Sequence, residues 1–355
     1  MSDKKDIIVF STFLSNGGAE RVLAELMNEW VSCGHKVQLM LIRNDVHGKN
    51  YPLDDRINVR RVVSKHKNRI LRRIDDLSSV RKLIMENPRS VLISFDLSTQ
   101  LLLGISKLFY KNKVVFSERN DPRRYPTKGF QRKARDIVFR FADICVFQTK
   151  EAMELFEGIK KGIVIPNPIG KNLPDLYEGN RRHVISAVCQ LEERKNIPML
   201  VDAFAKIEKK FPDYSVEIYG KGKDEENIRA YIETRGLTEK VKLMGFSHNV
   251  KEEIVDSAMY VSTSDYEGIS NSMIEALAMG IPSICTDCPI YGARAMIKDG
   301  VNGFLIPVGD VDMLADRMRY IIEHVDKSEE LSKAAFTIRE LYPVEMVAGK
   351  WLELM

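Results

Sequence analysis

Short apolar runs alternate with longer amphipathic stretches along the whole chain. This alternation is typical of βα units, which build a parallel sheet covered by helices on both faces. A helix is expected at residues 19–32, because Val22, Leu26 and Trp30 recur at helical spacing. The first series of strands is expected at residues 7–12, 37–42, 91–95, 114–117, 144–148 and 162–166.

A second series of the same kind follows the polar residues 171–182. Its strands are expected at residues 183–188, 215–219, 241–244, 259–263 and 282–286, and its helices at residues 197–209, 225–235, 250–257 and 272–279. Two successive series in 355 residues predict an α/β protein with two facing Rossmann-like domains, whose ligands belong in a cleft at the carboxyl ends of both sheets. A terminal helix is expected at residues 344–354, where Val347, Trp351 and Leu354 share one side.

The charge of the chain differs between its halves. Residues 1–170 contain 31 basic and 19 acidic residues, whereas residues 171–355 contain 23 basic and 31 acidic residues. A basic surface favours an anionic partner. The basic stretches 60–82 and 119–140 lack a recognised nucleic-acid-binding motif, so we expect no nucleic acid as partner. An anionic membrane surface or a pyrophosphate-bearing acceptor is favoured, and a solvated surface without a partner is the alternative.

Five basic residues are the candidates for contact with an acceptor or a membrane: Arg119, Arg123, Arg124, Arg132 and Lys133. The chain has no apolar run long enough for a signal peptide or for a helix that spans a membrane. We therefore expect a cytoplasmic protein, and the basic residues favour peripheral binding to the inner face of the cell membrane.

Two glutamates eight residues apart, Glu267 and Glu275, mark the strongest candidate site. Glu267 follows an expected strand, and Ser270 or Asn271 could cap the helix that comes next. The amino end of that helix would face an anion, and Glu275 could accept hydrogen bonds from a ribose diol. A capped surface helix with two solvated glutamates is the alternative.

The cations Arg194 and Lys195 follow another strand of the same series. Because the carboxyl ends of parallel strands meet at one edge of a sheet, both cations are expected on the side of the domain where Glu267 lies. Lysine and arginine at this position could clamp a diphosphate and stabilise the charge on a departing nucleoside diphosphate.

The order of these motifs resembles the retaining glycosyltransferases of family 4, which are group 1 glycosyltransferases of GT-B architecture, over nearly the whole chain. The motifs that carry the resemblance are Gly17-Gly18-Ala19-Glu20-Arg21, Ile165-Pro166-Asn167-Pro168, residues 191–196, Tyr219-Gly220-Lys221-Gly222, Gly245-Phe246, residues 267–275 and residues 299–303. The resemblance implies an acceptor-binding domain at residues 1–170 and a donor-binding domain at residues 171–339. It also implies that the helix in residues 340–355 crosses back to the first domain.

The resemblance implies roles for single residues. Glu267 would contact the hydroxyls of the donor sugar, Glu275 the ribose and Lys195 the diphosphate. Gly17 and Gly18 would let a loop of the first domain approach the phosphate. The further donor-binding candidates are Arg194, Gly220, Gly268, Ile269, Ser270, Asn271 and Ser272.

The chain departs from the family pattern at two places. Cys189-Gln190-Leu191 stands where many relatives have Gly-Arg-Leu, and Arg119 stands where many have a histidine after Ser-Glu. Arg119 cannot act as a base, because the guanidinium stays charged. Asp96 and Glu118 are therefore the candidate hydrogen-bond acceptors for the acceptor hydroxyl.

The similar enzymes keep the anomeric configuration. For this chain the resemblance implies a front-face attack in which the departing phosphate takes the proton while Lys195 and the helix dipole hold the negative charge. Neither a side-chain nucleophile nor a metal is then expected. Asp310-x-Asp312 looks like the metal-binding pair of another transferase architecture, but it opens an amphipathic stretch, which favours helix capping.

The sequence thus predicts transfer of a hexose-type sugar from a UDP- or GDP-sugar to a polysaccharide or a lipid-linked saccharide. Two alternatives stay open. One is a nucleotide-sugar epimerase or phosphorylase of the same architecture, and the other is a non-catalytic protein that binds nucleotide sugars. No cofactor is expected in any of these cases apart from the nucleotide sugar itself.

Overall fold

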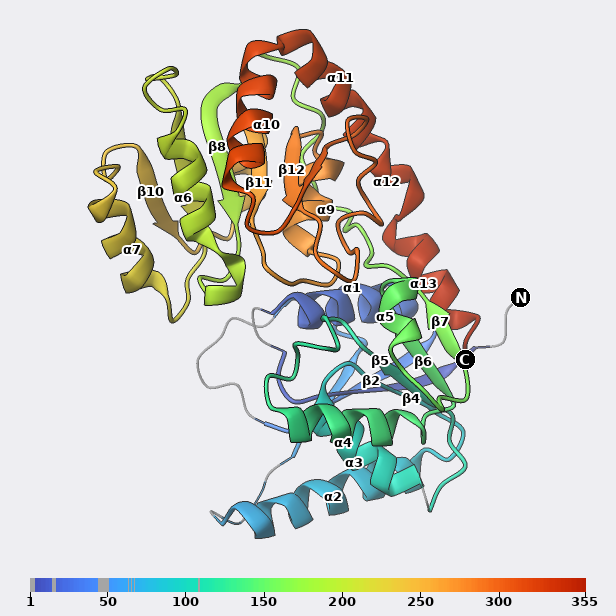
Figure 1. Cartoon of the computed structure of the whole chain (residues 1–355). Coiled ribbons are helices and arrows are strands. Elements are labelled where there is room, and N and C mark those ends of the chain that lie inside the picture. The colour runs from blue at the N-terminus through green and yellow to red at the C-terminus, as the bar shows by residue number, and fades with distance from the viewer. Residues whose placement is uncertain are drawn as a thin grey trace. The chain divides into compact units, whose positions relative to one another are not determined.

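The computed structural model describes residues 4–14, 17–43, 51–62, 64, 66, 68–107 and 109–355. The chain divides into two compact units (Figure 1). The first unit combines Met1–Pro168 with Pro343–Met355, and the second unit is Ile169–Tyr342.

The first unit contains a parallel sheet in the order β3-β2-β1-β4-β5-β6-β7. Its strands are β1 (Asp6–Ser11), β2 (Lys36–Leu41), β3 (Asn58–Arg61), β4 (Val91–Ser94), β5 (Val114–Ser117), β6 (Ile144–Phe147) and β7 (Gly162–Val164). The predicted strands are confirmed to within two residues at each end. The sequence analysis missed β3, an edge strand whose side chains are mostly exposed.

Helices cover both faces of this sheet (Figure 1). They are α1 (Gly18–Ser32), α2 (Arg69–Glu86), α3 (Leu97–Lys107), α4 (Gly129–Phe139), α5 (Lys150–Glu154) and α13 (Val344–Leu352). On one face α1 packs against α13, and on the other α3 packs against α2 and α4. The two tryptophans join α1 to α13: the ring centroids of Trp30 and Trp351 lie 6.3 Å apart, and Nε1 of Trp30 donates to the carbonyl of Ala348 at 3.2 Å.

The second unit repeats the strand order of the first, β10-β9-β8-β11-β12-β13, in a sheet that is also parallel throughout. Its strands are β8 (Arg182–Val188), β9 (Ser215–Tyr219), β10 (Val241–Gly245), β11 (Ser257–Ser262), β12 (Ser283–Thr286) and β13 (Phe304–Ile306). The chain moves outward in opposite directions from β8 and β11. In open α/β sheets, ligands bind outside the carboxyl ends of the two strands at such a reversal.

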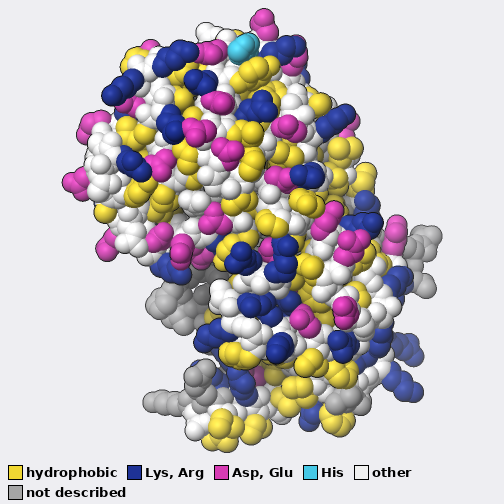
Figure 2. Space-filling view, in the orientation of Figure 1, with side chains coloured by type: hydrophobic (Ala, Val, Ile, Leu, Met, Phe, Trp, Pro, Cys, Tyr) yellow, Lys and Arg dark blue, Asp and Glu magenta, His cyan; other side chains and the backbone are white. Residues whose placement is uncertain are grey.

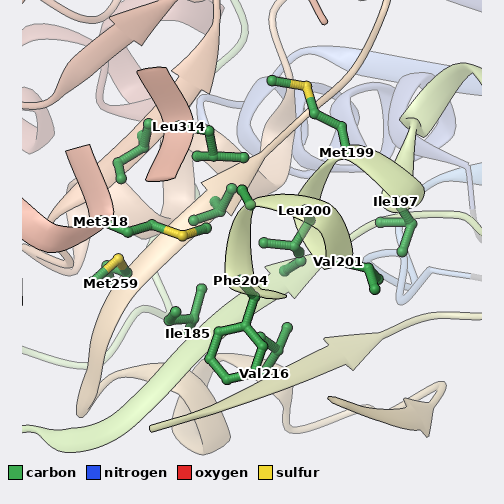
Figure 3. Close-up of a cluster of buried hydrophobic side chains, with 14 of the residues drawn as sticks. Ile185, Ile197, Met199, Leu200, Val201, Phe204, Val216, Met259, Leu314 and Met318 are labelled. Atoms are coloured by element: carbon green, nitrogen blue, oxygen red, sulfur yellow. The ribbon is translucent and has the colours of Figure 1, made fainter. Parts of the chain in front are cut away.

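The helices of the second unit also lie on both faces of the sheet. They are α6 (Ile197–Ala205), α7 (Glu225–Thr234), α8 (Val250–Ile254), α9 (Asn271–Ala278), α10 (Val311–Glu323), α11 (Val325–Phe336) and α12 (Ile338–Leu341). Side chains of α6 and α10 pack on the strands in one continuous core, which contains Ile185, Leu200, Phe204, Val216, Met259, Leu314 and Met318 (Figure 3). This packing fixes α6, and with it the loop that precedes the helix.

The two doubly wound parallel sheets confirm the prediction of an α/β protein with two Rossmann-like domains. Asp310 is the N-cap of α10, where Oδ1 accepts from the backbone N–H of Met313 at 2.9 Å. The capping explanation of Asp310-x-Asp312 is therefore confirmed. Within the described residues, none of the helices combines the length and the apolar composition that a membrane crossing requires.

Candidate active site

The loops after β8 and β11 are joined by hydrogen bonds at the carboxyl edge of the second sheet. The backbone N–H of Asp265 donates to the carbonyl of Arg194 at 2.8 Å. Oγ1 of Thr263 donates to the carbonyl of Lys195 at 2.9 Å, and Nδ2 of Asn196 donates to Oδ1 of Asp265 at 2.8 Å. The backbone that carries the two cations is therefore fixed by the neighbouring loop.

Asn196 connects this loop to α6 in a left-handed backbone conformation, with φ of 44° and ψ of 47°. Asparagine adopts this conformation more readily than most residues. Its Oδ1 accepts from the backbone N–H of Met199 at 3.3 Å and caps the helix. Sequence reasoning missed Asn196, although an asparagine before Ile197-Pro198 is a recognisable helix start.

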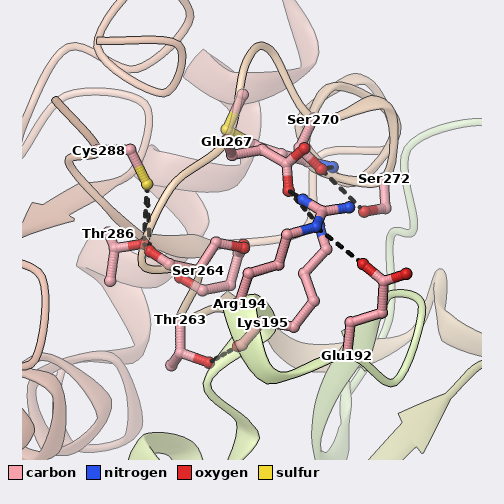
Figure 4. A network of polar contacts seen from close by, with 12 residues as sticks. Glu192, Arg194, Lys195, Thr263, Ser264, Glu267, Ser270, Ser272, Thr286 and Cys288 are labelled. Atoms are coloured by element: carbon pink, nitrogen blue, oxygen red, sulfur yellow. Dashed lines mark hydrogen bonds and ion pairs between the residues drawn. The ribbon is translucent and has the colours of Figure 1, made fainter. Parts of the chain in front are cut away.

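Glu267 meets both cations (Figure 4). Its Oε2 lies 2.7 Å from Nη1 of Arg194 and also contacts Nζ of Lys195. Nε of Arg194 further pairs with Glu192 at 3.0 Å. The side chains of Lys195 and Glu267 are 9% and 18% exposed, so water screens this cluster only in part.

The cations keep Glu267 ionised. Burial raises the pKa of Glu267, but the charges of Lys195 and Arg194 outweigh burial and hold the pKa below its usual value. An ionised Glu267 occupies donors that would otherwise be available to a phosphate. A diphosphate ligand would therefore compete with this carboxylate for the same two cations.

Ser270 caps α9, as one of the two predicted caps. Its Oγ accepts from the backbone N–H of Met273 at 3.5 Å and lies 3.1 Å from Oγ of Ser272. The hydroxyl of Tyr260 on β11 lies 2.9 Å from the same Ser272 oxygen. This chain of hydroxyls fixes the start of α9, where Asn271 is the first residue of the helix.

Glu275 lies one turn inside α9 and is 8% exposed. Its Oε1 is 3.0 Å from Nζ of Lys251 on α8, and the same ammonium donates to the carbonyl of Asn172 at 3.2 Å. The sequence analysis did not single out Lys251. No pattern in the sequence marks it, because the pair depends on how α8 lies beside α9.

Glycines let the loop after β9 approach the loop after β8. A Cβ atom on Gly220 would lie 1.8 Å from the carbonyl oxygen of Cys189, and one on Gly222 would lie 2.1 Å from that of Leu191. Gly220 also has a φ of 136°. In the structure Gly220 allows the two backbone segments to come close together. Its contact with a donor stays a prediction.

Gly268 and Ile269 are buried beside the start of α9. A Cβ atom on Gly292 would lie 2.0 Å from the carbonyl oxygen of Gly268, so two backbone segments meet there. Ile269 belongs to the core that contains the apolar side of α9. Both residues hold the segment that presents Glu267.

In the first unit, Asp96 joins the loop after β1 to the start of α3. Its carboxylate accepts from the backbone and the hydroxyl of Thr12 at 3.0 and 2.6 Å. It also accepts from the backbone and the hydroxyl of Thr99 at 3.1 and 2.9 Å. Gly17 is the N-cap of α1 and Gly18 its first residue, and their approach to a phosphate stays a prediction.

Glu118 is buried after β5 and pairs with Arg135 of α4 at 3.2 Å. Its Oε1 accepts from the backbone N–H groups of Arg119 and Asn120 at 3.0 and 3.1 Å. Burial raises the pKa of Glu118 to about 6, although Arg135 and these hydrogen bonds act in the opposite direction. These contacts shape the loop, and a contact with an acceptor hydroxyl stays a prediction.

Arg119 is 7% exposed, so the prediction that it belongs to an exposed basic surface is wrong. Its guanidinium lies over the rings of Phe95 and Trp351, at 4.5 and 5.4 Å from their centroids. Nη1 donates to Oδ1 of Asn167 at 3.0 Å. Burial lowers the pKa of Arg119 to about 9 despite the nearby charge of Glu118.

The other predicted basic residues lie at or near the surface. Arg124 and Lys133 are exposed. Arg123 pairs with the buried Asp121 at 3.0 Å, and Arg132 is half-buried and donates to the carbonyl of Pro126 at 2.8 Å. Among the described residues, no three His, Cys, Asp or Glu side chains are grouped so that they could hold a metal ion.

Residues 173–337 match the family model described as Glycosyl transferases group 1. The matched segment lies within the second unit and contains the loops of Lys195 and Glu267. Over 248 residues the chain is 27% identical to the poly(glycerol-phosphate) alpha-glucosyltransferase of Bacillus subtilis. The aligned region covers 68% of this chain and 37% of that protein. The chain thus matches little more than a third of the length of that relative.

Another relative matches almost end to end. The chain is 23% identical over 352 residues to a Campylobacter jejuni protein, and the alignment covers 96% of both chains. That protein is named GalNAc-alpha-(1->4)-GalNAc-alpha-(1->3)-diNAcBac-PP-undecaprenol alpha-1,4-N-acetyl-D-galactosaminyltransferase. The crystal structure of Anabaena HepE with UDP-glucose has a TM-score of 0.84, 18% identity and 98% of both chains covered. This likeness confirms the GT-B fold, and the sequence matches show that the chain is similar to glycosyltransferases of group 1.

Proposed function

We propose that this chain transfers a hexose-type sugar from a uridine-diphosphate donor to a saccharide that is part of a polymer or is linked to a lipid. The observation that carries the proposal is the cluster of Arg194, Lys195 and Glu267 outside the switch-point strands β8 and β11. This is where a Rossmann-like domain binds a nucleotide. The match of residues 173–337 to group 1 glycosyltransferases supports the assignment of these two cations to a diphosphate.

The printed names of similar proteins support the donor and the acceptor. HepE was crystallised with UDP-glucose, the Bacillus subtilis relative is named for poly(glycerol-phosphate), and the Campylobacter jejuni relative is named for an undecaprenol-linked saccharide. The names of both relatives also specify an alpha product. Since the sugar of UDP-glucose is alpha-linked, an alpha product supports the retaining mode of family 4.

The charges of the cluster suit a front-face reaction. A bound diphosphate displaces Glu267 from Lys195 and Arg194, which frees this carboxylate to accept hydrogen bonds from the sugar hydroxyls. The two cations and the amino end of α9 then stabilise the negative charge on the leaving phosphate. That phosphate accepts the proton of the attacking hydroxyl, so the route uses neither a metal nor a side-chain nucleophile.

A comparison of Lys195→Ala with Lys223→Ala tests this proposal. Lys223 is an exposed lysine in the loop after β9, so its loss removes the same charge outside the cluster. We expect Lys195→Ala to lower kcat by about a hundredfold or more while the donor KM changes less, because the charge on the leaving phosphate is largest in the transition state. Lys223→Ala should behave as the wild type.

The same series includes Glu275→Ala, for which we expect weaker nucleotide binding in a thermal-shift titration. Unchanged kinetics and binding in both the Lys195 and the Glu275 variants would remove the proposed site. Incubation with the nucleotide sugar alone distinguishes a transferase from the alternative of an epimerase, because an epimerase changes the sugar without an acceptor. Nucleotide binding without turnover on any acceptor would favour the non-catalytic alternative.

A further inference from the structure

Helix α2 of the first unit has two apolar sides. Val80, Leu83 and Ile84 are at most 2% exposed and face the unit, where α2 packs against α3. Ile74 and Met85 lie on the other side and are 58% and 68% exposed. An ordinary surface helix needs only the buried side, so the second stripe requires another explanation.

The outer stripe continues along the whole helix. Ile70, near its first turn, is 72% exposed and lies four residues before Ile74. A shallow hollow along the stripe is lined by Ile74, Leu77, Ser78, Arg81, Lys82, Met85, Glu86 and Tyr110. Next to the hollow, the ring of Phe109 is 64% exposed and has the guanidinium of Arg81 at 4.5 Å from its centroid. The apolar surface is thus contiguous, and such surfaces mark interaction sites.

Positive charge surrounds this stripe, because the acidic residues of α2 pair with basic residues from other segments. Asp75 lies 3.0 Å from Nδ1 of His66, Asp76 lies 2.7 Å from Arg43, and Glu86 lies 2.7 Å from Arg60. Among the described side chains, no ion pair joins Arg73, Arg81 or Lys82 of α2 to an acidic residue.

Arg73 and Lys82 are exposed and lie on opposite flanks of the outer stripe, given 100° per residue. Figure 2 shows hydrophobic side chains next to lysine and arginine side chains over the part of the first unit where α2 lies. An apolar centre with a cationic rim is complementary to a bilayer with anionic headgroups. The apolar side chains enter the interface, and the long basic side chains reach the phosphates.

We propose that α2 docks the protein on an anionic lipid surface through the stripe Ile70, Ile74 and Met85 together with the basic residues Arg73 and Lys82 on its flanks and Arg81 within it. The helix lies in the plane of the membrane surface, which its 18 residues and mixed composition suit. This inference does not rest on the proposed transferase activity, because it concerns a surface of the first unit and is measured without a donor. The sequence analysis expected an anionic partner for the basic stretches 60–82 and 119–140 and named single candidate residues only in the second stretch, whereas this inference assigns the contact to α2 and adds its apolar stripe.

Vesicle sedimentation with the full chain tests α2 directly. The probe is a vesicle of phosphatidylcholine and phosphatidylglycerol, compared with phosphatidylcholine alone at low and high salt. The test variant is Ile74→Asp with Lys82→Glu. Its matched control is Val325→Asp with Lys333→Glu, which makes the same kinds of change at exposed positions of α11 in the second unit. A third variant, Arg124→Glu with Lys133→Glu, tests the sequence-based prediction.

We expect the wild type and the α11 control to bind the anionic vesicles, and the α2 variant to bind at least about tenfold more weakly. Melting temperatures and nucleotide thermal shifts show whether the α2 variant keeps its fold. Three results would overturn the proposal: no binding by the wild type, equal binding to phosphatidylcholine alone, or a loss confined to the Arg124 and Lys133 variant.

Discussion

Burial raises the pKa of both Glu118 and Glu267, yet the pKa of Glu118 lies above its usual value and that of Glu267 below it. Glu267 faces two cations, Lys195 and Arg194, whose charges outweigh burial and lower its pKa. Glu118 pairs with Arg135, but burial prevails over this charge and the backbone hydrogen bonds, so that its pKa is raised to about 6. The balance between burial and the charges in contact therefore decides the direction in which the pKa of a buried glutamate shifts.

The raised pKa of Glu118 predicts a pH dependence of stability. Because the folded pKa of about 6 exceeds the ordinary value of 4.5, the folded state binds this proton more tightly than the unfolded state. The free energy of unfolding should therefore fall by about 2 kcal/mol, relative to Glu118→Gln, as the pH rises through this window. Urea denaturation of both proteins from about pH 4 to about pH 8 measures the difference. Parallel pH profiles would contradict the assignment.

At the scale of residues, the sequence predicted which side of the second unit the candidate side chains occupy, but not how these side chains pair. Lys195 and Glu267 follow expected strands of one series, so their common side of the domain could be inferred. Their direct contact could not, because it depends on β8 and β11 being neighbours. The contact of Lys251 with Glu275 was hidden for a similar reason, since nothing in the sequence places α8 beside α9.

At the scale of elements, the loops of the second unit depend on backbone contacts that allow no side chain. We predict that Gly220→Ala lowers the free energy of unfolding by more than about 3 kcal/mol, because its Cβ would overlap the carbonyl of Cys189 and its φ is positive.

The matched control for this change is Gly236→Ala. Gly236 has a positive φ of 68° but open space around the new Cβ, so it should lose only about 1–2 kcal/mol. Urea midpoints of the two variants separate steric overlap from backbone strain. Equal losses would mean that the approach of the two loops is not tight.

Most strands could be predicted from the sequence, and the two that were missed, β3 and β13, lie at the edges of their sheets. The helices α2, α3, α4 and α5 of the first unit were not predicted. The strands between others, such as β5 and β9, are apolar runs with clear ends, and their bounds were predicted without error. The edge strand β3 reads Asn-Val-Arg-Arg because one side of it faces solvent, and the edge strand β13 has only three residues. An edge strand can be short or half solvated, so the apolar pattern found the edge strands β7 and β10 but missed β3 and β13.

At the scale of the whole molecule, the first unit uses residues from both ends of the chain. Trp351 is fully buried between Trp30 and Phe95, with its ring centroid 5.3 Å from that of Phe95. We predict that Trp351→Ala lowers the stability of the first unit by about 3–5 kcal/mol and leaves the second unit unchanged.

Amide hydrogen exchange measures both units in one sample, with β1 and α1 reporting on the first unit and β8 and α6 on the second. Met346→Ala is the control, because Met346 lies on the same helix and is 46% exposed. A loss of protection spread equally over both units would refute this division of the chain. The helical pattern of residues 344–354 predicted α13, but only the packed structure shows that Trp351 completes this core.

The position of α13 has a consequence for synthesis on the ribosome. The second unit is one uninterrupted segment, Ile169–Tyr342, so all of its residues are available to one another once that segment has emerged. The first unit begins to emerge earlier but lacks the indole of Trp351 until translation has passed the second unit. The second unit, which is translated later, can therefore reach its native state sooner, while Trp30 and Phe95 of the first unit stay uncovered until α13 has emerged.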